Sequence, residues 1–381
     1  MAIAGIICEY NPFHTGHRKQ FSLVRNALGE ETTIVCLMSG NYVQRGAPAI
    51  FDKSVRAKAA LLSGADLVLN MPVPVSLSSA EGFADGGVKI LSGLCTHLAF
   101  GCETATEGTL TETVQGLLCP EFPTLLRKEL ESGICFPAAR EQALQKLGIS
   151  PSLLRSPNDT LAVEYCKAIS RQCAAILPLP LLREGAYHAE IPDRENPSAS
   201  SLRKYILTET DWQDYIPEKA AEVFRHAPVH DLSFGERAVL CRLRTMTDAE
   251  FEALPYGSEG LWRRFMRACR EEDTLDRILT QVKTKRYTRT RLDRMVLCAY
   301  LGITKEILTT PAPYVRILGF TQRGRKLLHG SEHSIPLLNA GTPAEGSYPC
   351  LEAQWDSLYG LFQANRPGIP LSEKKRRTIV L

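Results

Sequence analysis

Residues 5–17, GIICEYNPFHTGH, constrain the fold of this chain more than any other stretch. Residues 2–8 form an apolar run typical of a buried strand, and residues 17–28 have the apolar spacing of an amphipathic helix. A strand that turns directly into a helix predicts an α/β fold. The turn carries two histidines spaced His-Thr-Gly-His at the helix start, where free backbone N–H groups and the positive end of the helix dipole attract phosphate.

The same alternation of short β-branched runs and longer helical periods continues to about Leu182. The predicted strands are residues 32–38, 67–70, 97–100 and 176–182, and the predicted helices between them include residues 52–63, 78–92 and 158–169. This pattern predicts an N-terminal Rossmann-like domain with a parallel sheet. Residues 191–201, rich in proline, serine and charge, are the best candidate boundary. We therefore divide the chain into residues 1–205 and a mainly α-helical C-terminal domain, residues 206–381.

Local patterns in the second half are helical. Ser233 with Glu236, and Thr247 with Glu250, match the capping box, which predicts two helix starts. Residues 261–270 place Leu261, Trp262 and Phe265 on one face, and arginines 263, 267 and 270 on the other.

Composition indicates a soluble, cytoplasmic protein. No apolar run approaches the ~20 residues needed to cross a bilayer, and no basic segment precedes the first apolar run. The twelve cysteines are scattered and form no CxxC pair, so we interpret Cys95, Cys102, Cys166 and Cys173 as buried, reduced thiols. Pro228 between His226 and His230 argues against a metal-binding helix there, and no metal ligands are predicted.

The HTGH motif has a plausible chemistry. His14 and His17 lie on one side of the first helical turn, so both imidazoles could face a bound phosphate and stabilise the negative charge that builds up when a triphosphate is attacked. Gly16 would let a nucleotide approach the backbone, and Thr15 is the predicted N-cap. The alternative is that both histidines are surface or capping residues.

Two further segments could bind phosphate. In residues 39–56, SGNYVQRGAPAIFDKSVR, Arg45 or Lys53 could hold phosphates; alternatively the loop is solvated, with Asp52 as a helix cap and Arg56 on the surface. In residues 198–203, SASSLR, hydroxyls and an arginine stand at another predicted helix start, although serines there are usually caps.

Basic residues gather in two places in the second half, although the net charge is only +3. Residues 283–294, KTKRYTRTRLDR, include Tyr287 among the charges, and Arg316 belongs to a second cluster around GFTQRGRKLL; residues 374–377 repeat the bias. Arginines with an interleaved aromatic suit RNA phosphates and an unstacked base, whereas the alternative is a solvated helix face. The candidate RNA-binding residues are Lys283, Lys285, Arg286, Arg289, Arg291, Arg323, Arg325 and Lys326.

Several blocks together resemble one family, the bacterial tRNA(Met) cytidine acetate ligases, which are related to HxGH nucleotidyltransferases. The blocks are GIICEYNPFHTGH, SGNYVQRGAPAIFDKSVRAKAALLSGADLV, SPNDTLAVEY, SASSLR, KTKRYTRTR and YVRILGFTQRGRKLL, in order from residue 2 to about 330. The chain departs from the pattern at Asn70, where a glutamate is usual, and at Ser54, where an aromatic is frequent.

The resemblance implies a nucleotidyltransferase-like, ATP-binding catalytic domain and a helical tRNA-binding domain. It implies that acetate and ATP form acetyl-adenylate, and that the acetyl group then passes to N4 of the wobble cytidine of elongator tRNA(Met). His14 and His17 would be catalytic, with Mg²⁺ accompanying ATP; no protein partner is inferable. By likeness, the ATP site comprises Ile7, Cys8, Glu9, Tyr10, Asn11, Pro12, Phe13, His14, Thr15, Gly16, His17, Arg18, Lys19, Gln20, Gly101, Asn158 and Arg183.

Three other functions remain open at this stage. A nucleotidyltransferase that joins a nucleotide to a phosphorylated metabolite would not need a large basic helical domain. A non-catalytic tRNA-binding protein would not need both histidines. A class I aminoacyl-tRNA synthetase would share the HxGH motif. The sequence shows no KMSKS-like loop after the catalytic domain, which argues against this class.

Overall fold

A computed structural model describes residues 2–182, 197–328, 333–365, 368 and 373–381. Its centre is an eight-stranded sheet in the order β10-β8-β5-β2-β1-β6-β7, with β9 beside β8. The strands are β1 Ile3–Cys8, β2 Thr33–Ser39, β5 Leu67–Met71, β6 His97–Cys102, β7 Leu177–Leu182, β8 Val315–Phe320, β9 Leu337–Asn339 and β10 Ile379–Val380, and a separate hairpin pairs β3 Tyr42–Val43 with β4 Ala47–Pro48. The predicted α/β fold is confirmed, and the predicted parallel sheet corresponds to β5, β2, β1, β6 and β7.

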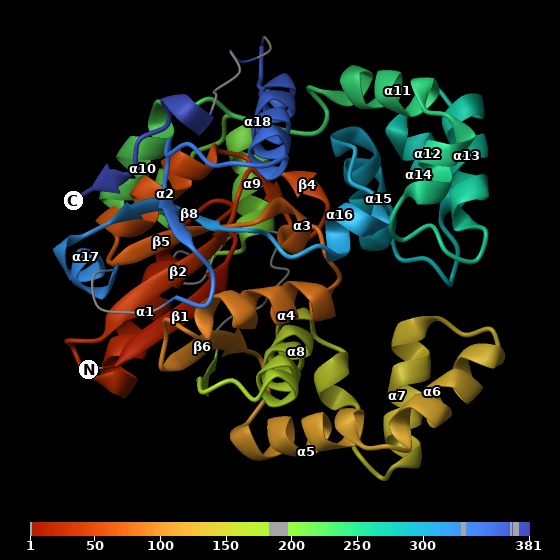
Figure 1. Cartoon of the computed structure of the whole chain (residues 1–381), viewed down its shortest axis with the longest axis horizontal. Coiled ribbons are helices and arrows are strands. Elements are labelled where there is room, and N and C mark those ends of the chain that lie inside the picture. The colour runs from red at the N-terminus through yellow and green to blue at the C-terminus, as the bar shows by residue number, and fades with distance from the viewer. Residues whose placement is uncertain (1, 183–196, 329–332, 366–367, 369–372) are drawn as a thin grey trace.

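Helices cover both faces of the sheet and form a separate group to one side (Figure 1). In the first half they are α1 Thr15–Leu28, α2 Lys53–Leu62, α3 Val73–Ser76, α4 Ala80–Leu91, α5 Glu107–Leu118, α6 Phe122–Glu131, α7 Phe136–Lys146, α8 Pro157–Gln172 and α9 Ala199–Leu207. In the second half they are α10 Glu218–Arg225, α11 Glu236–Thr245, α12 Asp248–Ala253, α13 Leu261–Glu271, α14 Leu275–Val282, α15 Arg289–Leu301, α16 Lys305–Thr309, α17 Gln322–Leu328 and α18 Tyr348–Tyr359.

Strand β2 shows how the sequence builds the two-sided core. All seven of its residues are buried. Because successive side chains point to opposite faces, Ile34 and Cys36 pack with the cluster that includes Phe21 of α1, whereas Val35 and Leu37 pack with the cluster beneath α4 and α8. A strand buried on both faces therefore reads as a continuous apolar run.

The second half of the chain has its own helical core but also returns to the sheet. Helices α11–α15 and α18 share a core that contains Phe251, Phe265 and Trp355. Strand β8 pairs antiparallel with β5, and β9 and β10 pair with β8. The division at residue 205 stays a prediction, and the sheet draws strands from both sides of it. The predicted boundary segment lies largely outside the described residues.

The predictions for Thr15 and for two of the cysteines are wrong in detail. The first helix begins at Thr15 with His14 as its N-cap, so Thr15 does not cap it. The hydroxyl of Thr15 instead donates a hydrogen bond to the backbone oxygen of Tyr215, at 3.2 Å. All twelve cysteines are free thiols, as expected, but only Cys95 and Cys102 of the four singled out are buried; Cys166 is half-buried and Cys173 is exposed.

Candidate active site

The two histidines of the HTGH motif contact each other at the junction of β1 and α1, through hydrogen bonds and a ring stack. The backbone N–H of His14 donates to Nδ1 of His17 at 3.2 Å, and the carbonyl of His14 accepts from the N–H groups of His17 and Arg18 at 3.0 and 3.2 Å. The two imidazoles stack, with centroids 3.7 Å apart and planes at 27°. His14 is 2% exposed and His17 is half-buried. The motif is therefore a rigid pair and not two loose surface residues.

The hydrogen bond at Nδ1 determines which atom of His17 is a donor. An Nδ1 that accepts an N–H carries no proton, so in the neutral ring the proton lies on Nε2. Tyr10 and Phe13 pack around this ring, with centroids 4.9 and 5.5 Å away. His17 can thus offer an oriented Nε2–H donor beside the helix N-terminus, which suits an anionic ligand.

Potential nucleophiles in the same segment are neutral. Burial is the largest cause that raises the pKa of the Cys8 thiol and of the Tyr10 phenol well above their usual values, and the neighbouring Cys36 adds to both. Tyr10 is 1% exposed and has a φ of 45°, an unusual backbone conformation for a bulky residue. The raised pKa values keep Cys8 and Tyr10 protonated near neutral pH, which does not favour Cys8 as a nucleophile.

The structure brings Gly101 and Asn158 to the same edge of the sheet. The parallel register pairs Ala4 with His97, and the same offset places Gly101 level with Cys8 at the carboxyl end of β1. Asn158, in the first turn of α8, donates from its side chain to Glu103 at 2.9 Å, just beyond β6. Arg183, the remaining predicted ATP residue, lies outside the described residues.

Asp159 holds this part of the edge together, although it was not singled out from the sequence. Its carboxylate accepts from the backbone N–H groups of Glu103 and Thr104, at 2.7 and 3.1 Å, and from the Thr104 hydroxyl at 2.8 Å. Burial alone would raise the pKa of Asp159, but these hydrogen bonds lower it. The sequence does carry a signal for this role. Asp159 stands three residues after Ser156, the N-cap of α8, and a side chain in the first turn of a helix can accept hydrogen bonds from a neighbouring loop.

The polar loop of residues 39–56 is a buried scaffold, contrary to both sequence interpretations of Lys53 and Arg56. Lys53 is 3% exposed and forms ion pairs with Asp356 and Glu373, at 2.9 and 3.0 Å, so it does not hold a phosphate. Arg56 is 0% exposed and donates to the carbonyls of Glu9, Ser39, Gly40 and Phe51. Of the basic residues in residues 39–56, only Arg45 is exposed.

Residues 198–203, which the sequence predicts as a further phosphate-binding segment, lie beside the HTGH motif. Ser198 caps α9 by accepting from the N–H of Ser201 at 3.1 Å. Arg203 donates to the backbone oxygen of Asn11 at 2.7 Å, so α9 contacts the turn before the HTGH motif. The side-chain oxygen of Asn11 also accepts from the N–H of Ile50, at 2.8 Å. Two segments predicted separately therefore contact each other in the fold.

The basic run of residues 283–294 lies at this edge of the sheet. Arg294 donates to the carbonyl of Gln44 at 3.3 Å, which places the start of α15 against the hairpin that follows β2. Lys283 and Lys285 are exposed and make no ion pair with any residue the structure describes. The exposed Arg286 and Arg289 pair with acids, while Arg291 donates to the carbonyl of Tyr256 at 2.7 Å.

The second basic cluster lies at the opposite edge. Arg323 of α17 pairs with Glu31, just before β2, at 3.2 Å, and the N–H of Thr321 donates to the carbonyl of Asp66, just before β5, at 2.9 Å. Figure 1 shows α17 on the far side of the sheet from α13–α15. Arg325 and Lys326 are exposed there. The two clusters do not share a face.

Three residues from the basic stretches of the sequence are buried. Tyr287 is 8% exposed, with the Arg291 guanidinium 5.2 Å from its ring centroid. Arg316 is 3% exposed and pairs with Glu352 at 3.1 Å, and Arg376 is 4% exposed and pairs with Asp52 at 2.8 Å. The positive charges of Arg316 and Arg376 are neutralised within the molecule.

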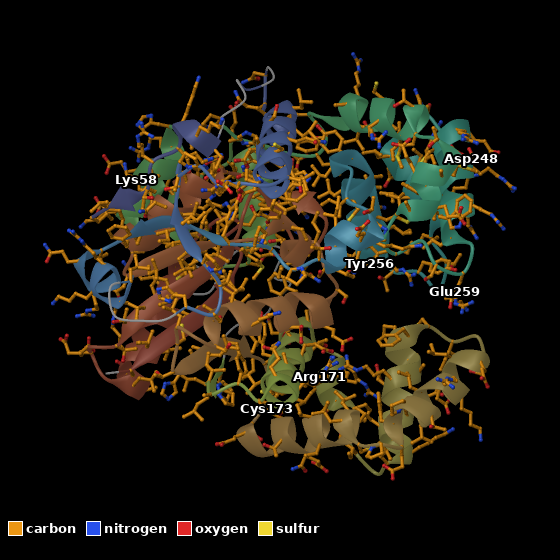
Figure 2. The ribbon with its side chains drawn as sticks, viewed as in Figure 1. Lys58, Arg171, Cys173, Asp248, Tyr256 and Glu259 are labelled. Atoms are coloured by element: carbon orange, nitrogen blue, oxygen red, sulfur yellow. The ribbon has the colours of Figure 1, made fainter. Side chains whose placement is uncertain are left out.

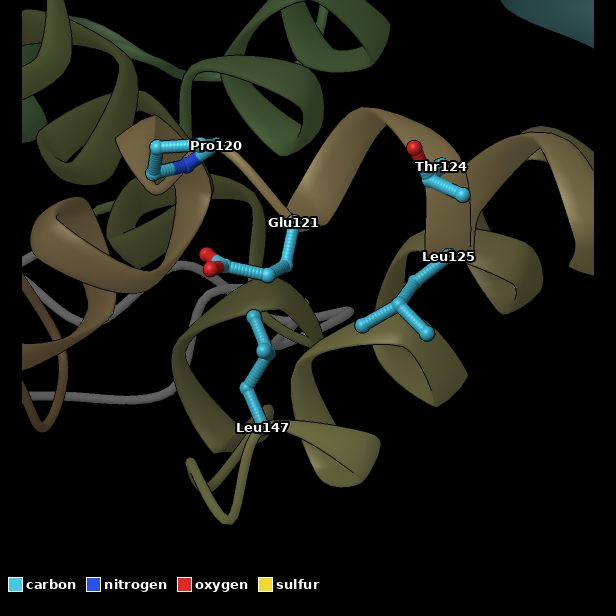
Figure 3. A pocket seen from close by; sticks show the side chains of 5 residues that line it. All are labelled: Pro120, Glu121, Thr124, Leu125 and Leu147. Atoms are coloured by element: carbon cyan, nitrogen blue, oxygen red, sulfur yellow. The ribbon is translucent and has the colours of Figure 1, made fainter.

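Other features lie away from the histidines. A surface pocket of about 520 Å³ is formed by α6 and its neighbours, and is lined by Pro120, Glu121, Thr124, Leu125 and Leu147 (Figure 3).

Within the described residues there is no group of three or more His, Cys, Asp or Glu side chains arranged to hold a metal ion. None of the helices described is long and apolar enough to span a bilayer.

Known proteins match this sequence over most or all of its length. A model of the HIGH Nucleotidyl Transferase family matches residues 1–365. A tRNA(Met) cytidine acetate ligase of Acetivibrio thermocellus is 36% identical over 366 residues, 89% of this chain and 88% of the relative, and one of Clostridium acetobutylicum is 31% identical with 100% of both chains covered.

Solved structures agree with the sequence relatives. The crystal structure of apo Thermotoga maritima TmcAL has a TM-score of 0.91 and 28% identity to this chain, and the form bound with alpha-thio ATP has a TM-score of 0.89 and 27% identity; each covers 100% of both chains. The chain therefore belongs to the HIGH nucleotidyl transferase family and, within it, to the tRNA(Met) cytidine acetate ligases.

Proposed function

We propose that this protein is an ATP-dependent ligase that acetylates N4 of the wobble cytidine of elongator tRNA(Met), through acetyl-adenylate. The observation that carries the proposal is the fixed His14–His17 pair at the N-terminus of α1, on the carboxyl edge of a parallel sheet. The names of the relatives and the ATP-analogue complex of the Thermotoga maritima protein support it.

In the first step, an acetate oxygen attacks the α-phosphorus of ATP and pyrophosphate leaves. Acetate is a poor acyl donor until its oxygen becomes part of a good leaving group, and adenylation achieves this. Negative charge builds up on the phosphate oxygens, and donors such as the Nε2–H of His17, whose ring is fixed by the hydrogen bond at Nδ1, are in place before the reaction. Such donors stabilise the charge without reorganisation.

In the second step, the amine nitrogen of cytidine attacks the acyl carbon, AMP leaves and the amine loses a proton. The cytidine must reach the carboxyl edge of the sheet, and residues 283–289 are the exposed basic segment on that side. We therefore assign RNA binding first to this segment. The cluster on α17 lies at the other edge.

Mg²⁺ would enter with ATP, since triphosphate oxygens are ligands that this ion prefers. We name no protein ligand for it. Free cysteines and a tRNA substrate support a cytoplasmic location.

The direct test is incubation with ATP, radiolabelled acetate and elongator tRNA(Met), followed by digestion to nucleosides. We expect labelled N4-acetylcytidine that requires ATP and is absent when the wobble cytidine is replaced by uridine. Pyrophosphate release without a labelled nucleoside would instead indicate a nucleotidyltransferase. RNA binding with neither product would indicate a binding protein.

A further inference from the structure

The turn of residues 44–46, between β3 and β4, joins the two parts of the proposed site. The backbone N–H of Gln44 donates to the carboxylate of Glu9 at 2.9 Å, and the carbonyl of Gln44 accepts from Arg294 at 3.3 Å. Glu9 belongs to the predicted nucleotide segment, and Arg294 belongs to helix α15, which follows the exposed basic segment. Gln44 therefore contacts both the predicted nucleotide segment and helix α15.

The turn is held rigidly against α15. Gly46 has a φ of 81°, which favours glycine, and its N–H donates to the carbonyl of Val43 at 2.9 Å to close a three-residue hairpin loop. A Cβ at position 46 would lie 2.5 Å from the carbonyl carbon of Asp293. The backbone of the turn thus packs directly on the helix, and no side chain fits between them.

Arg45 is the middle residue of this turn and is exposed. Its neighbours on both sides are fixed, so the arginine extends from a rigid support between the nucleotide segment and the basic segment. A guanidinium offers a planar set of donors that matches a phosphate in two-point hydrogen bonds. Both proposed substrates that meet at this junction carry phosphate groups.

We propose that Arg45 binds a backbone phosphate of the RNA and so positions the cytidine against the adenylate. This inference rests on the proposed function. The RNA is favoured over the nucleotide as the source of the phosphate because the turn packs on α15, the helix that follows the exposed basic segment.

The test compares Arg45→Ala and Arg45→Lys with the wild type in two assays. The first is acetate-dependent exchange of pyrophosphate into ATP without RNA; the second is the kinetics of tRNA acetylation. For Arg45→Ala we expect exchange within about 2-fold of wild type and a kcat/KM for tRNA lower by about 10- to 100-fold. Arg45→Lys should recover part of the loss because it keeps the charge but not the two-point geometry.

A third measurement is the salt dependence of tRNA binding, whose slope on logarithmic axes should fall by about 0.7 to 0.9 in Arg45→Ala when one phosphate contact is lost. Lys58→Ala is the matched control, because Lys58 is an exposed cation on the opposite side of the molecule from Tyr256 and Glu259 (Figure 2). An equal fall in exchange would assign the phosphate to the nucleotide, and unchanged kinetics would remove any role; either overturns the proposal. Failure of the wild type to acetylate tRNA would reject the proposed function itself.

Discussion

At the scale of single residues, Arg56 shows what a sequence leaves open. The sequence places it in a polar loop with two equal interpretations, phosphate binding nearby or a solvated surface. In the structure it is fully buried and donates to four backbone carbonyls, two of which belong to the last residue of β2 and the residue after it. Every residue type has a backbone carbonyl, so the sequence does not show which carbonyls a buried arginine will bind. The structural role of Arg56 could therefore not be predicted.

Replacement of Arg56 by Met should destabilise the protein strongly, since it leaves the carbonyls of Glu9, Ser39, Gly40 and Phe51 without their donor. We expect the free energy of unfolding to fall by about 3–5 kcal/mol, the cost of breaking a buried charged network. Lys at this position should be intermediate because it has fewer donors. Urea unfolding measures both, and exposed Lys58→Met on the same helix should change stability by less than about 0.5 kcal/mol. A loss below about 1 kcal/mol for Arg56→Met contradicts this account.

At the scale of elements, capping rules work when both partners are local. Thr247 and Glu250 form the predicted capping box at the start of α12. Ser233 and Glu236 match the same pattern, yet α11 starts only at Glu236, with Gly235 as its N-cap. Ser233 donates to Asp231 instead, and Glu236 accepts from the N–H of Leu275. Distant or competing partners override a local pattern, and a single sequence does not reveal them.

The C-terminal segment is tied to the start of α2 by buried charge. Arg376 pairs with Asp52, at 2.8 Å, and with Glu373, at 3.2 Å. Burial alone would raise the pKa of Asp52, but the charge and hydrogen bonds of Arg376 hold it well below its usual value. Glu373 is also buried, and Lys53 and Arg376 lower its pKa. A carboxyl with a lowered folded pKa stabilises the protein above its unfolded pKa of about 4, and this stability is lost as the pH falls below that value.

Arg376→Met should therefore lower the free energy of unfolding at pH 7. The difference from the wild type should stay constant down to about pH 5 and narrow as the pH falls through 4, because protonated carboxyls no longer need the arginine. Urea unfolding at pH 7, 5 and 3.5 measures this difference. A gap that is wider at pH 3.5 than at pH 7 would show that Asp52 and Glu373 are not stabilised by Arg376.

At the scale of the whole molecule, the parallel part of the sheet could be predicted from the sequence, because each strand there is followed by its covering helix. The return of β8, β9 and β10 could not, since their pairing partners lie far away in the chain. This return places α17 at the amino edge of the sheet, so the two basic clusters that are close in sequence lie at opposite edges.

Charge reversal distinguishes the two edges. Lys283→Glu with Lys285→Glu should weaken tRNA binding by about 10-fold or more and reduce its salt dependence, since each phosphate contact contributes to both. Arg325→Glu with Lys326→Glu changes charge by the same amount at the far edge and should leave tRNA acetylation near the wild-type rate. Filter binding at several salt concentrations and acetylation kinetics measure these effects. The reverse result would place the RNA on α17.

The most direct test of the central claim is acetate-dependent exchange of labelled pyrophosphate into ATP, in the wild type and in His17→Asn. Asparagine keeps an acceptor near the place of Nδ1 for the N–H of His14 but removes the Nε2–H donor. We expect exchange in the wild type that requires acetate, and a fall of about 10²- to 10³-fold in the variant at a temperature where both proteins are shown to be folded by thermal unfolding. Exchange at the wild-type rate in His17→Asn, or wild-type exchange that does not require acetate, would contradict the account.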